Sequence, residues 1–169
     1  MLYILVIALC VAADQWMKWW TVANLSVYGS APLLPGIVEL KYIQNTGGGF
    51  SILTGHTWLL AGLTVVLMAI LGWLLFKKVF PHPLAMWSLT VILGGGIGNL
   101  IDRIRLGFVV DMFNLQFMNY PVFNIADIFV VCGAIGFAVY YLLIDGKAVK
   151  AKEIKTEETA DDGTDQSES

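Results

Sequence analysis

Three long apolar segments constrain what this chain can fold into more than any other feature of its sequence. Thr57–Phe76 and Ala85–Ile101 contain no charged residue, and Ile125–Ile144 contains a single aspartate near its start. A helix that crosses a lipid bilayer needs about 20 mostly apolar residues. Each segment is close to that length, so the sequence predicts three membrane-spanning helices in this part of the chain.

The N-terminal segment predicts a fourth span. Met1–Ala13 is apolar but gives only about 20 Å of helix at 1.5 Å per residue, so it crosses only if the helix continues past Asp14. Three tryptophans before residue 21 favour this, because tryptophan concentrates at membrane interfaces. A secretory signal is one alternative, but the apolar run has no Lys or Arg before it. A lipoprotein signal ending at Cys10 is another, which Leu9 disfavours. We predict a retained helix over about residues 2–20.

The composition agrees with a membrane protein and excludes several other classes. Of the 169 residues, 57% are hydrophobic and 14% are charged, and the mean hydropathy is +0.73. Soluble domains carry about 25% charged residues. Residues 1–144 contain no basic patch, so we expect no binding of nucleic acid. The two cysteines lie in apolar runs and offer neither a disulfide framework nor a metal-ligand spacing.

The distribution of Lys and Arg predicts the orientation in the membrane. With four spans, Lys77, Lys78 and the four lysines after residue 144 lie on one side, which should be the cytoplasmic side. The other side carries four Lys or Arg residues. Both termini are therefore expected in the cytoplasm. Residues 146–169 are polar and acidic, and we predict a disordered cytoplasmic tail.

Two segments on the extracytoplasmic side complete the predicted fold. Residues 37–43 alternate between two faces, with Val38, Leu40 and Tyr42 on one of them, which is typical of a β-strand. We expect Asp102–Asn124 to lie at the membrane surface as a helix or loop. The fold class is then an all-α polytopic membrane protein with a small extracytoplasmic β-like cradle and one domain over residues 1–145. Its four transmembrane helices are predicted at about 2–20, 57–76, 85–101 and 125–144.

The acidic residues between positions 1 and 144 gather on one side of the predicted topology. An ionisable residue within a membrane span is costly, which makes it a candidate for function. Asn99 shares a helix face with two charged neighbours through i,i+3 and i,i+4 spacing. Asn124 lies three residues before an aspartate and is expected to cap that helix. The aspartates on this side are Asp14, Asp102, Asp111 and Asp127.

Glycines surround this polar group. A cluster of four precedes Asn99 between residues 94 and 98, and small residues let membrane helices approach closely, so we assign the cluster to helix packing. A second glycine-rich stretch follows Asn45. It does not match the phosphate-binding pattern GxxxxGK[ST], so we expect no nucleotide.

Paired carboxylates in an apolar setting offer hydrolytic chemistry without a cofactor. When two lie close together, one pKa rises and the pair shares a proton. The charged member can take a proton from water while the protonated member donates to a carbonyl oxygen, as in aspartic proteases. Asp111, in the expected surface loop, and Asp127, at a helix start, are the best pair by position. Their spacing alone does not bring them together.

Five short motifs carry a resemblance to the bacterial lipoprotein signal peptidases (signal peptidase II, prolipoprotein signal peptidase). They follow one another in the family's order, and the resemblance covers the chain apart from its tail. The motifs are Asp14-Gln15-x-x-Lys18, Asn45-x-Gly47-x-x-Phe50-Ser51, Gly98-Asn99-x-x-Asp102-Arg103, Val109-Val110-Asp111 and Phe123-Asn124-x-Ala126-Asp127.

The resemblance implies a four-helix aspartic endopeptidase of the bacterial cytoplasmic membrane, with its site at the outer face. Members remove the signal peptide from diacylglyceryl-modified prolipoproteins by cutting before the lipidated cysteine. Carried over by motif, Asp111 and Asp127 are the catalytic residues, with no cofactor and no metal. The substrate-binding residues would be Asn45, Asn99, Arg103 and Asn124, and the supporting residues Asp14, Lys18, Asp102 and Gly47. Gln44, Gly48 and Gly49 depart from the family's usual residues.

A small proton- or ion-coupled transporter is the main alternative. Intramembrane aspartates and asparagines also form proton relays and ion paths. Such a path crosses the midplane, whereas the cytoplasmic halves of these spans carry no acid. A scaffold protein that uses these residues only for helix packing is a second alternative.

Overall fold

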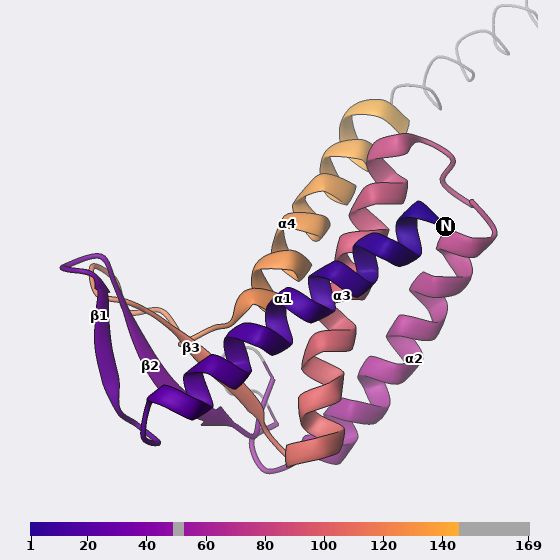
Figure 1. Ribbon diagram of the computed structural model, residues 1–169. Helices are drawn as coiled ribbons and strands as arrows, with labels where there is room; N and C mark the ends of the chain where they lie inside the picture. Colours follow the sequence, from indigo (N-terminus) through magenta and orange to yellow (C-terminus); the bar gives the residue numbers. More distant parts are fainter. Residues whose placement is uncertain (49–52, 146–169) are drawn as a thin grey trace, which may run out of the picture.

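The computed structural model describes residues 1–48 and 53–145 and contains four long helices and a small sheet (Figure 1). The predicted acidic tail (146–169), Gly49 and the motif residues Phe50 and Ser51 lie outside the described residues.

All four helices are long and apolar enough to cross a membrane, which confirms the predicted spans. The first, α1 (Leu2–Asn24), continues beyond residue 20, and α2 (Thr57–Phe76) has the predicted bounds. The third, α3 (Pro83–Leu106), begins two residues earlier and ends five residues later than predicted, because Gly107 ends it in the left-handed conformation (φ 80°). The last, α4 (Ile125–Tyr140), continues as a short π-helical segment, Tyr141–Asp145.

Helix α3 forms the centre of the bundle and packs against α1, α2 and α4. Its glycines make these contacts possible, as expected from the sequence. A Cβ atom at Gly94 would lie 2.5 Å from the Cβ of Cys10 in α1. A Cβ at Gly98 would lie 2.5 Å from Oδ2 of Asp14. The glycines therefore let α1 lie directly against α3 where α1 carries its aspartate.

An antiparallel sheet adjoins one end of the bundle, in the order β1 (Ser30–Leu34), β2 (Val38–Asn45) and β3 (Val109–Leu115). Strand β2 confirms the predicted strand, and Leu40 and Tyr42 are buried as its alternation indicated. They form a small core with Val110 and Met112 of β3. The surface helix or loop expected between residues 102 and 124 is therefore wrong in part, since β3 lies within this segment and residues 109–112 of the strand are buried.

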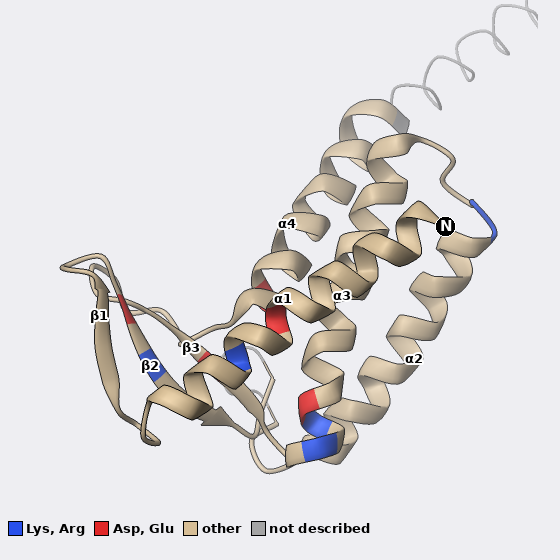
Figure 2. Cartoon of the chain, viewed as in Figure 1, with Lys and Arg blue, Asp and Glu red and all other residues tan. Residues whose placement is uncertain are grey.

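The two ends of the bundle differ in charge (Figure 2). The chain begins at the end of the bundle away from the sheet, where Lys77 and Lys78 follow α2 (Figures 1 and 2). The charged residues within α1 to α4 all lie toward the sheet. They are Asp14, Lys18, Asp102, Arg103, Arg105 and Asp127.

Candidate active site

Asp111 lies in β3 and is almost completely buried, with 2% of its surface exposed. Its Oδ2 accepts a hydrogen bond from Nδ2 of Asn45 in β2 at 2.9 Å. Its Oδ1 accepts one from Nδ2 of Asn124 at 2.7 Å. The expectation that Asp111 occupies a surface loop is therefore wrong. The residue lies in β3, and the pairing of β3 with β2 fixes the backbone that carries its carboxylate.

Asp127 lies in the first turn of α4 and is held by the helix cap. The side chain of Asn124 accepts a hydrogen bond from the backbone N–H of Asp127 at 2.9 Å, as expected for a capping residue. In return, Oδ2 of Asp127 accepts from the backbone N–H of Asn124 at 3.1 Å. Oδ1 of Asp127 accepts from Nδ2 of Asn99 at 2.8 Å. Both oxygens of this carboxylate are thus oriented by fixed donors.

Asn124 joins the aspartate pair (Asp111 and Asp127) through its side chain. Its Nδ2 donates to Oδ1 of Asp111 and also to Oδ1 of Asn99, the latter at 3.0 Å. Asn99 in turn donates to Asp127. A continuous set of hydrogen bonds therefore runs from one aspartate to the other.

Arg103 connects α3 to the loop after β2. Its Nη2 donates to the carbonyl oxygen of Gly47 at 3.1 Å. The backbone N–H of Gly47 donates to Oδ1 of Asn45 at 2.9 Å, which fixes the orientation of that amide. The buried Nε of Arg103 has no hydrogen-bond partner among the described residues.

The Lys18 cluster (Asp14, Lys18 and Asp102) is buried beside the pair. Nζ of Lys18 lies 2.9 Å from Oδ2 of Asp14 and 3.0 Å from Oδ2 of Asp102. It also donates to Oδ1 of Asn99 at 2.8 Å. Gln15 belongs to the same network, since its Nε2 donates to Oδ1 of Asp102 at 2.9 Å. Gln15 was not predicted as a site residue, although it stands within the first motif.

A cavity of about 480 Å³ opens beside these groups. Both aspartates line it, together with Asn45, Asn99 and Arg103. The rest of its wall is largely apolar. It includes Ile43, Val109, Val122, Phe123, Val130 and Val131. A cavity with an apolar wall and a few converging polar groups is typical of a binding site.

The surroundings of Asp111 change its protonation. Burial, and then the nearby charge of Asp127, raise the pKa of Asp111 from 3.8 to about 7, against the opposing effects of the hydrogen bonds from Asn45 and Asn124 and the charge of Lys18. At neutral pH, Asp111 is therefore divided between its protonated and charged forms. This gives the pair one proton donor beside one possible base.

The structure thus brings all the predicted site residues into one region. Both predicted catalytic residues line the cavity, as do Asn45, Asn99 and Arg103. Asn124 and the predicted supporting residues contact this group directly or through Lys18. Within the part of the chain that the structure describes, no group of three or more His, Cys, Asp or Glu side chains could hold a metal ion.

Comparison with known proteins assigns the chain to a family. A model of the family described as "Signal peptidase (SPase) II" matches residues 6–143. This chain belongs to the signal peptidase II family. The family resemblance inferred from the five motifs is confirmed, and the transporter alternative has no support.

Relatives support the same assignment. The chain is 40% identical over 151 residues to a lipoprotein signal peptidase of Enterococcus faecalis, covering 88% of this chain and 91% of the relative. It is 38% identical over 143 residues to that of Latilactobacillus sakei, covering 85% and 95%. A solved structure described as a bacterial membrane enzyme matches with a TM-score of 0.79 at 25% identity, covering 85% of this chain and 88% of the other. As a signal peptidase II with four spans, the chain is a protease and a multi-pass bacterial membrane protein.

Proposed function

We propose that this signal peptidase II is an aspartic endopeptidase that removes signal peptides from diacylglyceryl-modified prolipoproteins. Cleavage occurs before the lipidated cysteine. The observation that carries the proposal is the arrangement of Asp111 and Asp127, which line one cavity and are connected through Asn124. The name lipoprotein signal peptidase, which the relatives bear, supports the substrate class.

The aspartate pair performs hydrolysis by dividing the roles of acid and base. Asp111 is the proton donor, because its pKa of about 7 keeps it partly protonated at neutral pH. Asp127 takes the proton from a water molecule, which attacks the scissile carbonyl carbon. Asp111 protonates the carbonyl oxygen as the tetrahedral intermediate forms. Asp127 then gives its proton to the leaving nitrogen while Asp111 takes a hydroxyl proton back, so that the C–N bond breaks to an amine and a carboxylic acid and the pair returns to its starting state. Acid–base catalysis by positioned groups contributes about 10²–10⁴-fold to a rate.

The polar residues of the cavity bind the peptide backbone around the scissile bond. A peptide drawn into a membrane has carbonyl groups that no water can reach. Arg103, Asn45 and Asn99 line the cavity and supply the polar groups that would bind such carbonyls. Asn124 contributes less directly, because its side chain is fully buried and already bonded. Fixing the substrate in this way converts binding energy into a lower barrier.

The site lies at the extracytoplasmic face of the cytoplasmic membrane, and both termini are cytoplasmic. The position of Lys77 and Lys78 at the opposite end of the bundle supports this orientation. The signal peptide lies among the spans while the diacylglyceryl chains stay in membrane lipid. Residues 1–145 form the peptidase domain, and residues 146–169 form an acidic cytoplasmic tail. The reaction requires no cofactor, metal, nucleotide or nucleic acid.

A cleavage assay in detergent tests the proposal. The substrate is a purified prolipoprotein, prepared with and without the diacylglyceryl group, and cleavage is followed as a shift on a gel. We expect the wild type to cut the lipidated form, with no effect of chelators or serine reagents, and Asp127→Asn to be inactive while still folded. A folded wild type that cuts neither form would overturn the proposed substrate. A fully active Asp127→Asn would overturn the proposed chemistry.

A further inference from the structure

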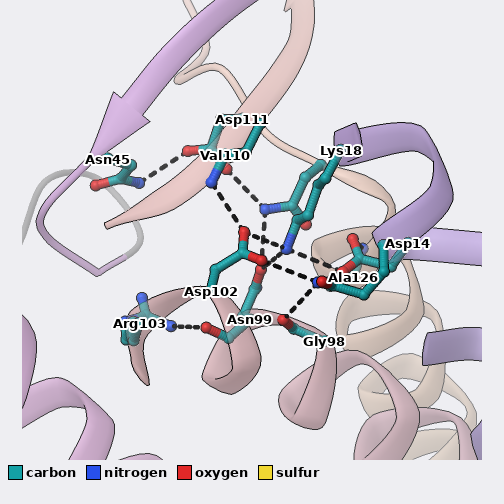
Figure 3. Close-up of polar contacts among 12 residues, drawn as sticks. Asp14, Lys18, Asn45, Gly98, Asn99, Asp102, Arg103, Val110, Asp111 and Ala126 are labelled. Carbon is teal, nitrogen blue, oxygen red and sulfur yellow. Dashed lines mark hydrogen bonds and ion pairs between the residues drawn. The ribbon is translucent and has the colours of Figure 1, made fainter. Parts of the chain in front are cut away.

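The Lys18 cluster makes the same contact with each half of the aspartate pair. Oδ2 of Asp102 accepts a hydrogen bond at 3.0 Å from the backbone N–H of Val110, the residue directly before Asp111. Oδ1 of Asp14 accepts one at 3.0 Å from the backbone N–H of Ala126, the residue directly before Asp127. Each carboxylate of the cluster therefore fixes the backbone that carries one aspartate of the pair (Figure 3).

Lys18 holds these two carboxylates at a set separation. Its ammonium group lies 2.9 Å from Asp14 and 3.0 Å from Asp102, and its side chain is 3% exposed. Asp14 and Lys18 come from α1, whereas Asp102 comes from α3. The distance between β3 and the start of α4 is thus determined through one cation that is bonded to both sides.

Lys18 also orients the amide of Asn99, together with Nδ2 of Asn124, which donates to the same oxygen at 3.0 Å. The oxygen of an asparagine side chain accepts and its nitrogen donates, so the partners determine the orientation. Lys18 Nζ can only donate, and it lies 2.8 Å from Oδ1 of Asn99. Nδ2 of Asn99 must then face Asp127, to which it donates at 2.8 Å.

From this geometry we infer that Lys18 is a positioning residue for catalysis, which sets the separation of Asp111 and Asp127 and directs the Asn99 donor to Asp127. The inference rests on the proposed function and deepens it, because it gives a mechanism to a residue that touches neither aspartate of the pair in any described hydrogen bond or ion pair. Helix packing alone would need none of these directed contacts, since an apolar side chain of similar length could fill the same space.

Electrostatics adds a measurable consequence. The charged groups around Asp111 are Lys18 and Asp14 of α1, Asp102 and Arg103 of α3, and Asp127 of α4. The positive charge of Lys18 lowers the pKa of Asp111 and so opposes the effect of burial. Removal of that charge should therefore move the loss of the Asp111 proton to higher pH. A substitution that only loosens the packing of the helices, without changing the charge near Asp111, would not move this titration.

The test compares Lys18→Met with Lys41→Met, which makes the same substitution in β2 away from the cavity lining. Rates are measured against pH and substrate concentration in detergent and expressed per folded enzyme. For Lys18→Met we expect kcat to fall about 10²-fold, as for a small misplacement of reacting groups, with KM little changed. The high-pH limb of the rate profile should also move to higher pH. Lys41→Met should match the wild type in kcat and pH profile.

A second variant covers the case in which Lys18→Met leaves two buried carboxylates unbalanced and does not fold. Asp14→Asn combined with Lys18→Met removes one charge of each sign and keeps the net charge of the site. It should show a similar loss of kcat, whereas the high-pH limb should move less than in Lys18→Met, because loss of the Asp14 charge offsets part of the loss of the Lys18 charge. Unchanged kcat and an unchanged pH profile per folded enzyme, in whichever variant folds, would overturn the inference.

A measurement without substrate separates this inference from the proposed function. The difference in melting temperature between a protein and its Asp111→Asn derivative, followed against pH, reports the titration of Asp111. We expect the midpoint of this titration to lie at higher pH in Lys18→Met than in the wild type. Suppose that the wild type cleaves no substrate and that the midpoint nevertheless moves. The proposed function is then wrong, and the coupling of Lys18 to the pair stands. If the wild type cleaves but the midpoint does not move, only the inference is overturned.

Discussion

The two ends of the helix bundle are held together by different interactions. At the sheet end, buried carboxylates, amides, Lys18 and Arg103 connect α1, α3, α4 and the sheet. At the opposite end, aromatic rings make the contacts. Phe80 packs against Phe137 with ring centroids 5.2 Å apart, and His82 stacks on Tyr140 at 5.3 Å.

The end of the bundle away from the sheet, here called the apolar end for its aromatic contacts, shows that this chain can join its helices without buried charge. Burying ionised groups costs free energy that even good pairing only partly offsets, and polar residues within a membrane are correspondingly rare. The concentration of such groups at the sheet end therefore serves something other than stability. This contrast can be tested by substitutions that affect one end and leave the other intact.

The largest effect is expected from Asp111→Asn. This substitution removes the proton donor while keeping the shape of the side chain, so we expect cleavage to fall by about 10³-fold or more. The melting temperature should stay within a few degrees of the wild type. The initial rate of prolipoprotein cleavage in detergent measures the first quantity and thermal unfolding the second. A variant that retains a tenth of the wild-type rate would remove Asp111 from catalysis.

The next largest effect should be the dependence of the cleavage rate on pH. Asp111 must keep its proton to act as the donor, and its pKa lies near 7, so the cleavage rate should fall about tenfold per pH unit well above that value. The same raised pKa means that the protonated form is favoured by folding. Stability should therefore decline as the pH rises from about 4 to about 7.

The melting temperature of the wild type across that pH range checks the stability prediction. Asp111→Asn should lose much of the slope, because it has no carboxyl group to titrate at this position. An equal slope in both proteins would assign the pH dependence to other groups.

A matched pair of glycine substitutions compares the two ends directly. At Gly98 an added Cβ would lie 2.5 Å from the Asp14 carboxylate, whereas at Gly72 in α2 it would meet no described atom within 4 Å. Gly98→Ala should therefore cost about 1–3 kcal/mol of stability through overpacking, and it should also lower kcat by displacing Asp14. Gly72→Ala should leave activity unchanged and raise stability by about 0.5–1 kcal/mol. Unfolding curves and cleavage rates measure both. Equal effects at the two positions would contradict the contrast.

The smallest effect on the cleavage rate is expected from Phe137→Leu, at the end of the bundle away from the sheet. It removes ring contacts with Phe80 and Tyr140, and aromatic pairs of this kind contribute about 0.5–1.5 kcal/mol each beyond the area they bury. The melting temperature should fall by several degrees, and the rate per folded enzyme should not change. A lower kcat in this variant would show that the two ends are coupled.

Much of the fold could be predicted from the sequence because membrane spans are specified by local composition. A long apolar run without charge, such as Thr57–Phe76, has few possible structures other than a membrane-spanning helix. Strand β3 was missed for the opposite reason. Four consecutive residues, 109–112, are buried, so the strand shows no alternation. The residues of β2 with which it pairs lie more than sixty positions earlier in the chain.

The candidate site was predicted residue by residue from a family resemblance, and the contacts within it were not. Spacing could not show that Asp14 would bond to the backbone before Asp127, since 112 residues separate the partners. The same holds for Asp102 and Val110, where the bond requires a tight turn at Gly107 between helix and strand. Such contacts follow from tertiary structure, which local pattern does not encode.

The hydrogen bond between Asp14 and the start of α4 has a consequence for biosynthesis. The first spanning helix leaves the ribosome with a carboxylate whose backbone partner is made only at residue 126, and the second aspartate of the pair follows at residue 127. A partly inserted chain therefore holds Asp111 without its companion. Under the proposed mechanism, a chain whose last helix has not yet been made lacks the base of the pair and cannot cleave a peptide.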